Sequence, residues 1–375
     1  MLGLATISHM EFSCVPVQMT LELLPSRTEM ERAAYSKDAS YDGVFFVAVR
    51  TTGIFCRPSC PARAKLENVE FFPTIRDAVL AGYRPCKRCH PLLVYGALPD
   101  WVTTLMQRVE SAPDAKITAT ELRELGTTPE RVRRWFREHY GMTFVEWCRR
   151  RRLANALTQI QAGAKLDDVV FANQYESHSG FREAFSKVFG VPPGQSQTSD
   201  FVATQILETP LGALLVGAVS QGICAIAYTD KQMLEHNYAT IRKHFDYPIL
   251  PVTNQHIEHL RDELSGYFAG NLTDFTIPLA PQGTAFQERV WSELQSIPYG
   301  TTISYDELAR RIGQPTAVRA VARANGMNRI DILIPCHRVI GKDGQLTGYN
   351  GGIWRKRLLL ELERTGKLPS NETIQ

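Results

Sequence analysis

Four cysteines in two close pairs constrain the fold of this chain more than any other feature. Cys56 and Cys60 have three residues between them, Cys86 and Cys89 have two, and 25 residues separate the pairs. Each short spacing lets two sulfurs turn toward the same ion, and four thiolates match the tetrahedral coordination that zinc prefers. The spacing therefore predicts one Zn²⁺ ion with four cysteine ligands in the N-terminal part of the chain.

The distribution of charge favours a nucleic-acid partner more than the total charge does. The net charge is only +3, but residues 50–90 hold eight Lys/Arg against three Asp/Glu. Residues 131–152 hold eight Arg against two Glu. Clustered arginine suits phosphate binding, although a solvated charged face gives the same pattern. Grouped cysteines without a membrane-length apolar stretch favour a cytoplasmic protein in which cysteines bind metal or react.

Composition divides the chain of 375 residues into more than one domain. Residues 1–98 mix short β-like runs with turn residues, and residues 100–193 have helical periodicity. Beyond a Pro/Gly/Ser-rich linker, strand-like runs precede a predominantly helical region that starts near residue 284. The sequence predicts a multidomain protein with α/β and all-α parts.

Two helix pairs are expected in the middle of the chain. The first has helices at 119–125 and 130–139, with Thr128 as N-cap and Pro129 at the first helical position of the second helix. A second pair is expected over 166–189. On periodicity alone an ordinary helical hairpin explains the first pair. Arginines on one face of its second helix, Arg131 and Arg134 among them, favour a helix-turn-helix that reads DNA.

A Cys-His pair near the C-terminus has the residue types of a nucleophile with its base. Cys336 and His337 lie in the run IPCHRV, and the last predicted helix carries Glu361 and Glu363. A cysteine nucleophile needs a base to take its proton, and the base needs an orienting carboxylate. Either glutamate can supply it. Upstream, an alanine-rich helix with Arg319 follows a short helix near Tyr305, which makes a further helix-turn-helix candidate.

Five runs of the sequence resemble the bacterial Ada family of adaptive-response regulators and DNA methyltransferases. The resemblance extends from about residue 27 to 368 in the same domain order. The matching runs are FFVAVRTTGIFCRPSC at 45–60, RPCKRC at 84–89, GTAFQ at 283–287, VRAV at 318–321 and IPCHRV at 334–339.

The resemblance implies a multidomain fold of α/β and all-α parts. Each part has an expected function and expected boundaries. The four parts are a zinc-bearing α/β methyl-phosphotriester repair domain at 1–98, an AraC-like all-α double helix-turn-helix at 100–195, an RNase-H-like α/β subdomain at 200–281, and a helical alkylguanine-DNA alkyltransferase active domain at 282–370.

The resemblance also implies two acceptor cysteines, each used once. Cys336 would take methyl groups from O6-alkylguanine and O4-alkylthymine, and zinc-bound Cys56 would take them from methyl phosphotriesters of the DNA backbone. Each thioether is stable, so the enzyme is a single-turnover methylated-DNA–protein-cysteine S-methyltransferase. Methylation of Cys56 would convert the protein into a sequence-specific transcriptional activator.

Further residues near Cys336 receive roles from the family pattern. His337 would relay the proton of Cys336 through a water to Glu363, and Asn328 would support the active-site turn. These types fit the requirement for a base and an orienting carboxylate, and the resemblance selects Glu363 over its neighbour.

DNA contacts are expected from five residues. Arg319 would fill the gap left by a flipped base, because the alkylated oxygen is not accessible for in-line attack within the stack. Tyr305 would push the target phosphate. Arg63, Arg131 and Arg134 are the expected contacts of the two N-terminal DNA-binding parts.

The expected partners are double-stranded DNA, at alkylated lesions and at promoters, and RNA polymerase. The resemblance implies a monomer in the cytoplasm, associated with the nucleoid when it is bound to DNA, and no membrane. One alternative is a zinc-containing AraC-type transcription factor with a vestigial alkyltransferase domain. Another is a cysteine hydrolase. Cys336, His337, Asn328 and Glu363 together argue against the first, and the lack of an oxyanion arrangement argues against the second.

The sequence departs from the family pattern at the turn of the second helix pair. AraC-type units usually have glycine before an aromatic residue there, and this chain has Gln174 before Tyr175. Glycine is favoured where the backbone becomes left-handed. The departure predicts a change in operator recognition or activation strength and leaves the repair function unaffected.

Overall fold

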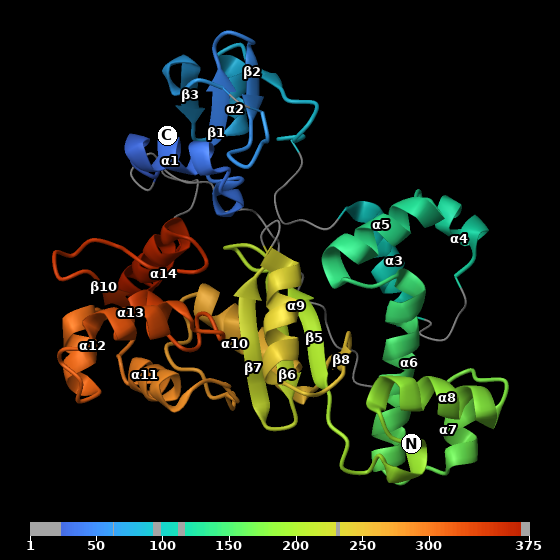
Figure 1. Ribbon diagram of the computed structural model, residues 1–375. Helices are drawn as coiled ribbons and strands as arrows, with labels where there is room; N and C mark the ends of the chain where they lie inside the picture. Colours follow the sequence, from blue (N-terminus) through green and yellow to red (C-terminus); the bar gives the residue numbers. More distant parts are fainter. Residues whose placement is uncertain (1–23, 63, 93–98, 112–116, 230–232, 369–375) are drawn as a thin grey trace. The chain divides into compact units, whose positions relative to one another are not determined.

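The computed structural model describes residues 24–62, 64–92, 99–111, 117–229 and 233–368 (Figure 1). These residues form two compact units. One contains the described residues up to Leu92, with 208–213 and Leu368, and the other contains the remainder.

A small sheet forms the centre of the N-terminal unit. Its strand order is β3-β1-β2-β4, with β1 antiparallel to β2 and β3, and with β2 parallel to β4. Phe46 and Ala48 lie on the same face of β1, where they pack with Phe55 and with Ala78 of α2. The elements are α1 Arg27–Ser36, η2 Ala39–Tyr41, β1 Phe46–Val49, β2 Ile54–Cys56, η3 Leu66–Asn68, β3 Val69–Phe72, α2 Ile75–Leu80 and β4 Arg84–Pro85.

The described residues in the middle of the chain form six helices, which confirm the two predicted helix pairs. Thr128 caps α5 by accepting a hydrogen bond from the Arg131 amide, and Pro129 is its first residue. Long helix α6 runs from the first pair to the second (Figure 1). The helices are α3 Asp100–Ser111, α4 Ala119–Glu124, α5 Pro129–Tyr140, α6 Phe144–Gln161, α7 Leu166–Ala172 and α8 His178–Phe189, followed by η4 Pro193–Gln195.

The backbone at the turn between α7 and α8 is left-handed, and the family pattern usually has glycine at this position. Gln174 has a φ of 58°, a region that non-glycine residues rarely occupy. The aromatic ring that follows, Tyr175, packs against Phe181 of α8 with 5.1 Å between ring centroids. Gln174 therefore adopts at this turn the left-handed conformation that usually favours glycine.

The third region contains a four-stranded sheet in the order β7-β6-β5-β8. β6 is antiparallel to both neighbours, whereas β5 and β8 are parallel. Every residue of β6 is buried, so both faces of the sheet are covered. Helices α9 and α10 both pack against β6 and β7 (Figure 1). The elements are β5 Val202–Leu207, β6 Leu214–Val219, β7 Gly222–Tyr228, α9 Met233–His244, β8 Ile249–Leu250 and α10 Gln255–Phe268.

The last region is helical and carries a helix-turn-helix made of α12 and α13. Thr284 and Gln287 form a capping box at the start of α11, which packs against both helices. Strands β9 and β10 pair in parallel, and β10 directly follows the turn at Cys336. The elements are α11 Ala285–Gln295, β9 Ile303–Ser304, α12 Tyr305–Arg311, α13 Val318–Gly326, η5 Cys336–Arg338, β10 Val339–Ile340 and α14 Ile353–Thr365. None of the helices among the described residues is long and apolar enough to cross a membrane.

Candidate functional site

The four predicted zinc ligands converge at one end of the small sheet. Cys56 ends β2, Cys60 lies in the turn that follows, and Cys86 comes directly after β4. The Sγ atoms of these three residues and of Cys89 all lie within 4.8 Å of one another. Backbone amides of Arg57 and Arg88 donate to the sulfurs of Cys89 and Cys86, each at 3.4 Å.

The electrostatics of this cluster fit a bound dication. Hydrogen bonding to Cys60 and Cys89, together with burial, raises the pKa of the Cys56 thiol well above its usual range. Four sulfurs at this spacing therefore cannot all ionise without a cation between them. Bound zinc reverses that balance and keeps coordinating thiols deprotonated, so the donor set fits zinc.

The two arginines predicted to contact DNA from the first helix-turn-helix lie on its second helix, α5. Arg131 and Arg134 are exposed on α5. Trp135 and Phe136 of the same helix are buried in the core. Arg131 also lies over the ring of Trp101, 5.2 Å from its centroid. Arg63, predicted to contact DNA from the N-terminal part, lies outside the described residues.

Asn328 holds the turn that carries the C-terminal cysteine. Its side-chain amide donates to the carbonyl of Ile334 at 2.8 Å and to Sγ of Cys336 at 3.1 Å. Its carbonyl oxygen accepts from the Ile330 amide at 3.0 Å. The predicted support of the turn by Asn328 is thus a direct contact with the sulfur as well as with the backbone.

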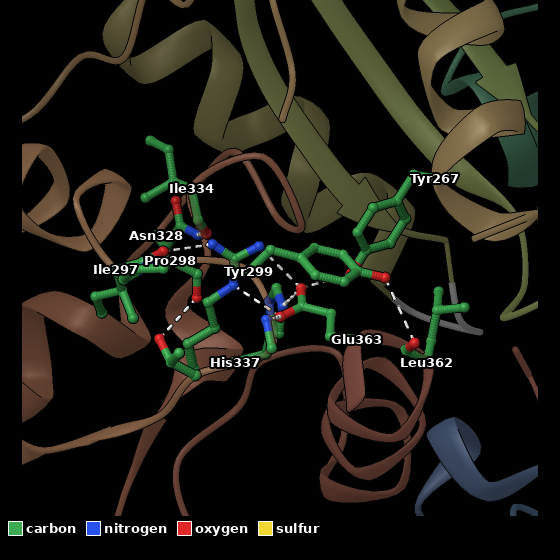
Figure 2. Close-up of polar contacts among 12 residues, drawn as sticks. Tyr267, Ile297, Pro298, Tyr299, Asn328, Ile334, His337, Leu362 and Glu363 are labelled. Atoms are coloured by element: carbon green, nitrogen blue, oxygen red, sulfur yellow. Dashed lines mark hydrogen bonds and ion pairs between the residues drawn. The ribbon is translucent and has the colours of Figure 1, made fainter. Parts of the chain in front are cut away.

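His337 bonds directly to the carboxylate of Glu363. The Nε2–Oε1 distance is 2.7 Å, and both side chains are fully buried (Figure 2). The ring and the glutamate are therefore in direct contact, and the relay through a water stays a prediction. With Nε2 facing Glu363, Nδ1 is the nitrogen left to receive a proton, and it has no hydrogen-bond partner among the described residues. Glu361, the alternative carboxylate, pairs with Arg364 instead.

Three further groups hold the Glu363 carboxylate. Arg338 donates to it through Nε at 2.8 Å and through Nη2 at 3.0 Å. The hydroxyl of Tyr267, from α10, donates at 2.8 Å (Figure 2). The amide of Gly300 donates at 3.1 Å. Residues that are distant in sequence therefore hold the Glu363 carboxylate rigidly beside His337.

The pKa values of Glu363, His337 and Cys336 follow from this arrangement. Burial opposes ionisation of Glu363, but the hydrogen bonds and charges of His337 and Arg338 lower its pKa to about 2. Burial lowers the pKa of His337, so the imidazole is neutral at physiological pH. Burial and the charge of Asp331 raise the pKa of the Cys336 thiol to about 12. The thiol therefore needs a base, and a neutral imidazole is held next to it in the sequence.

Tyr305 and Arg319, expected to contact DNA at the Cys336 site, lie on the helix-turn-helix of α12 and α13. Tyr305 begins α12, and its hydroxyl donates to the carbonyl of Thr347 at 3.1 Å. Arg319, in the first turn of α13, is exposed. Its side chain projects from the same helix whose C-terminal end leads into Asn328.

Known protein families match the same regions of this chain. The chain matches the family models "Metal binding domain of Ada" at residues 29–91, "Helix-turn-helix domain" at 122–199, and the ribonuclease-like and DNA binding domains of "6-O-methylguanine DNA methyltransferase" at 202–281 and 285–365. It is 36% identical over 346 residues to the Escherichia coli bifunctional transcriptional activator/DNA repair enzyme Ada, which covers 88% of this chain and 95% of the relative. The chain belongs to the Ada family.

Shorter relatives match the C-terminal part of this Ada-family chain. The methylated-DNA–protein-cysteine methyltransferase of Mycobacterium bovis is 45% identical over 168 residues, covering 45% of this chain and 95% of the relative. A crystal structure of Mycobacterium tuberculosis OGT in complex with DNA is 41% identical, with a TM-score of 0.39, and covers 44% of this chain and 96% of that one. Together with the Ada metal binding domain, the convergence of the four cysteines establishes the zinc site of this chain.

Three residues of the site were not among those expected for this Ada-family chain. Arg338 stands next to His337 in the motif, and the run IPCHRV was a signal that it belongs to the site. Tyr267 lies 96 residues before Glu363, and no local pattern pointed to it. Asp331, five residues before Cys336, places a second buried carboxyl beside the sulfur.

Proposed function

We propose that this chain repairs alkylated DNA by irreversible transfer of methyl groups to two of its own cysteines. Cys336 takes them from O6-alkylguanine and O4-alkylthymine, and zinc-bound Cys56 takes them from backbone methyl phosphotriesters. Methylation of Cys56 turns the protein into a sequence-specific activator of the adaptive response. The observation that carries the proposal is the buried His337–Glu363 pair behind a thiol that Asn328 holds in place.

At Cys336 the proposed step is a single displacement. His337 takes the thiol proton at Nδ1 while its Nε2–H stays bonded to ionised Glu363, which orients the ring and stabilises the imidazolium. The sulfur attacks the methyl carbon, the C–S bond forms as the bond from carbon to guanine O6 breaks, and the base takes up one proton in exchange. No group in the site reverses a thioether, so each molecule reacts once.

Access to the lesion requires that the base leave the duplex. Arg319, exposed at the start of α13, is placed to occupy the gap in the stack. Tyr305 on α12 is placed to press on the phosphate of the target nucleotide. Arg131 and Arg134 contact DNA from the middle domain, and Arg63 does so from the N-terminal one.

At Cys56 the proposed signal is a change of charge. Zinc, when bound, supplies the positive charge that keeps the sulfur an ionised nucleophile. Four thiolates and one dication have a formal charge of −2, and methylation of one sulfur makes it −1. A site that faces DNA phosphate then repels it less.

We infer the same four-part division that the sequence predicts, at 1–98, 100–195, 200–281 and 282–370. The acting form is a monomer in the cytoplasm, associated with the nucleoid when bound to DNA. Double-stranded DNA is its partner at lesions and promoters, and RNA polymerase is its partner in activation.

Mass spectrometry of the intact protein after incubation with methylated duplex DNA tests the proposal. We expect two added methyl groups, which peptide mapping places on Cys56 and Cys336. Cys336→Ala should abolish transfer from methylguanine and keep transfer from phosphotriesters, and Cys56→Ser should do the reverse. Label from methylguanine on the Cys336→Ala protein contradicts the assignment. Phosphotriester transfer alone in the wild type indicates a transcription factor with a vestigial alkyltransferase domain.

Salt dependence tests the charge mechanism at Cys56. We expect methylation to increase DNA affinity, and this gain should shrink as salt is raised, because screening weakens the repulsion that methylation relieves. Titration of labelled promoter DNA with methylated and unmethylated protein at several salt concentrations measures the gain. A gain that stays constant from roughly 0.05 to 0.5 M salt contradicts relief of charge repulsion as its cause.

A further inference from the structure

A second buried carboxyl group borders the acceptor sulfur, on Asp331. Its side chain is 2% exposed, and Sγ of Cys336 donates to its Oδ1 at 4.0 Å. The mechanism proposed above does not use it, because the carboxylate that orients His337 is Glu363. A carboxyl group this close to a nucleophile affects the charge that the nucleophile can carry.

The backbone holds Asp331 at this position from both sides. Its amide donates to the Ile226 carbonyl of β7 at 3.0 Å, and the Ile226 amide donates to the Arg329 carbonyl at 2.8 Å. The next residue, Ile332, has a φ of 74°. A β-branched residue in the left-handed region is a strained outlier, which persists only where the surrounding structure imposes it. The approach of the carboxyl to the sulfur is therefore a fixed feature of the turn.

The charged and titratable groups around Asp331 leave it close to the boundary between acid and anion. The positive charge of Arg355 on α14 lowers the pKa of Asp331, and its guanidinium also lies 3.9 Å from the ring centroid of Tyr228 on β7. Tyr349, from the loop before α14, adds a buried hydroxyl but no positive charge. Burial outweighs Arg355 and raises the pKa of Asp331 to about 7.

The charge of Asp331 acts directly on the sulfur. As an anion it raises the pKa of the Cys336 thiol, whereas the Asn328 amide and the buried ammonium of Lys356 lower it. An ionised carboxylate accepts the S–H hydrogen bond and stabilises the unreactive thiol. A carboxylic acid has no such charge, and its O–H can donate to the sulfur as negative charge develops there.

We propose that Asp331 controls the reactivity of Cys336, acting as a carboxylic acid that supports the thiolate and as a carboxylate that suppresses it. The inference rests on the proposed methyl transfer to Cys336 and specifies its regulation. The proton on Asp331 stays there throughout the transfer, and His337 takes the thiol proton. Methyl transfer should consequently slow as pH rises through the range in which Asp331 ionises. An ordinary thiol shows the reverse dependence, because it reacts faster as more of it becomes thiolate.

The test is the rate of methyl transfer from O6-methylguanine in duplex DNA to Cys336 as a function of pH. We expect the wild-type rate to level off or fall above about pH 7, and Asp331→Asn to keep rising with pH. At about pH 8.5 the Asp331→Asn protein should be faster by on the order of ten-fold, the effect of one pKa unit on the thiol. Below about pH 6 the rates of the two proteins should agree within roughly two-fold, because the side chain at position 331 is then uncharged in both.

Asp331→Ala, which removes the carboxyl altogether, should also lose the high-pH decline. Thermal unfolding and phosphotriester transfer to Cys56 show whether the variants remain folded and bind DNA. Profiles of the same shape in wild type and Asp331→Asn, or an equal loss at every pH, overturn the inference. If neither variant folds, the wild-type profile decides, and a rate that climbs steadily through about pH 8.5 overturns it. Absence of any transfer to wild-type Cys336 contradicts the proposed function instead.

Discussion

Replacing Glu363 with glutamine should lower methyl transfer to Cys336 by about 100-fold or more, the usual range for loss of acid–base catalysis. The amide cannot stabilise an imidazolium at His337, and either end of it can face Nε2, so the tautomer that leaves Nδ1 free is no longer imposed. The change also leaves the positive charge of Arg338 buried without its anion. Breaking a buried pair of this kind costs about 3–5 kcal/mol of unfolding free energy.

Glu361→Gln is the matched control for this experiment. Glu361 lies on the same helix two residues earlier and pairs with Arg364 at the surface. Exposed pairs contribute about 0.2–1 kcal/mol, so this variant should unfold and react almost as the wild type does. Single-turnover kinetics and denaturant unfolding of both variants give the two quantities. Equal rates for Glu363→Gln and the wild type would show that the carboxylate has no part in activating the thiol.

The sequence alone could not decide which of these two glutamates orients His337. Helix periodicity and residue type left Glu361 and Glu363 as equal candidates, and the resemblance chose between them. The physical reason is the packing of α14 against the turn at Cys336–Arg338, which brings one of them to His337. A side chain's direction on a helix can be predicted from sequence, but the identity of the surface it meets cannot.

Local chemistry was predicted well because its determinants lie within a few residues. The spacing of Cys56 and Cys60 is enough to predict a shared ion, and Thr128 with Pro129 is enough to predict the start of α5. In contrast, Tyr267 reaches the site from a helix of the neighbouring subdomain. Its contribution depends on how the β5–β8 sheet and α10 pack against the final helices, and residue spacing carries no information about that.

Asp331 could not be assigned from sequence for a related reason. Its position close to Cys336 in the chain does not reveal which way its carboxyl points. The direction is set by the left-handed Ile332 and by backbone pairing with Ile226, more than 100 residues earlier. Both are consequences of tertiary structure, and neither residue type predicts them.

Removing zinc should unfold the N-terminal domain while leaving methyl transfer to Cys336 intact. The hydrophobic core of this domain is small: Phe46, Ala48, Phe55 and Ala78 form one buried cluster, and further buried side chains include Tyr41, Val44 and Phe45. A core of that size stabilises a domain of about 70 residues only weakly, so the metal must supply much of the folding free energy. Zinc binding contributes about 10–16 kcal/mol in small zinc peptides, and without the ion the four thiols only crowd one another.

Chelation of the full-length protein, followed by limited proteolysis and circular dichroism, measures the unfolding. We expect rapid cleavage within residues 29–91, loss of phosphotriester repair, and an unchanged rate of transfer from O6-methylguanine. Cys60→Ser should reproduce these effects, because three remaining thiolates bind zinc more weakly. Cys148→Ser is the matched control, since Cys148 is a partly buried free cysteine far along the chain from the zinc cluster. An N-terminal domain that stays protease-resistant without zinc would show that its small core suffices, and zinc would then serve only the reactivity of Cys56.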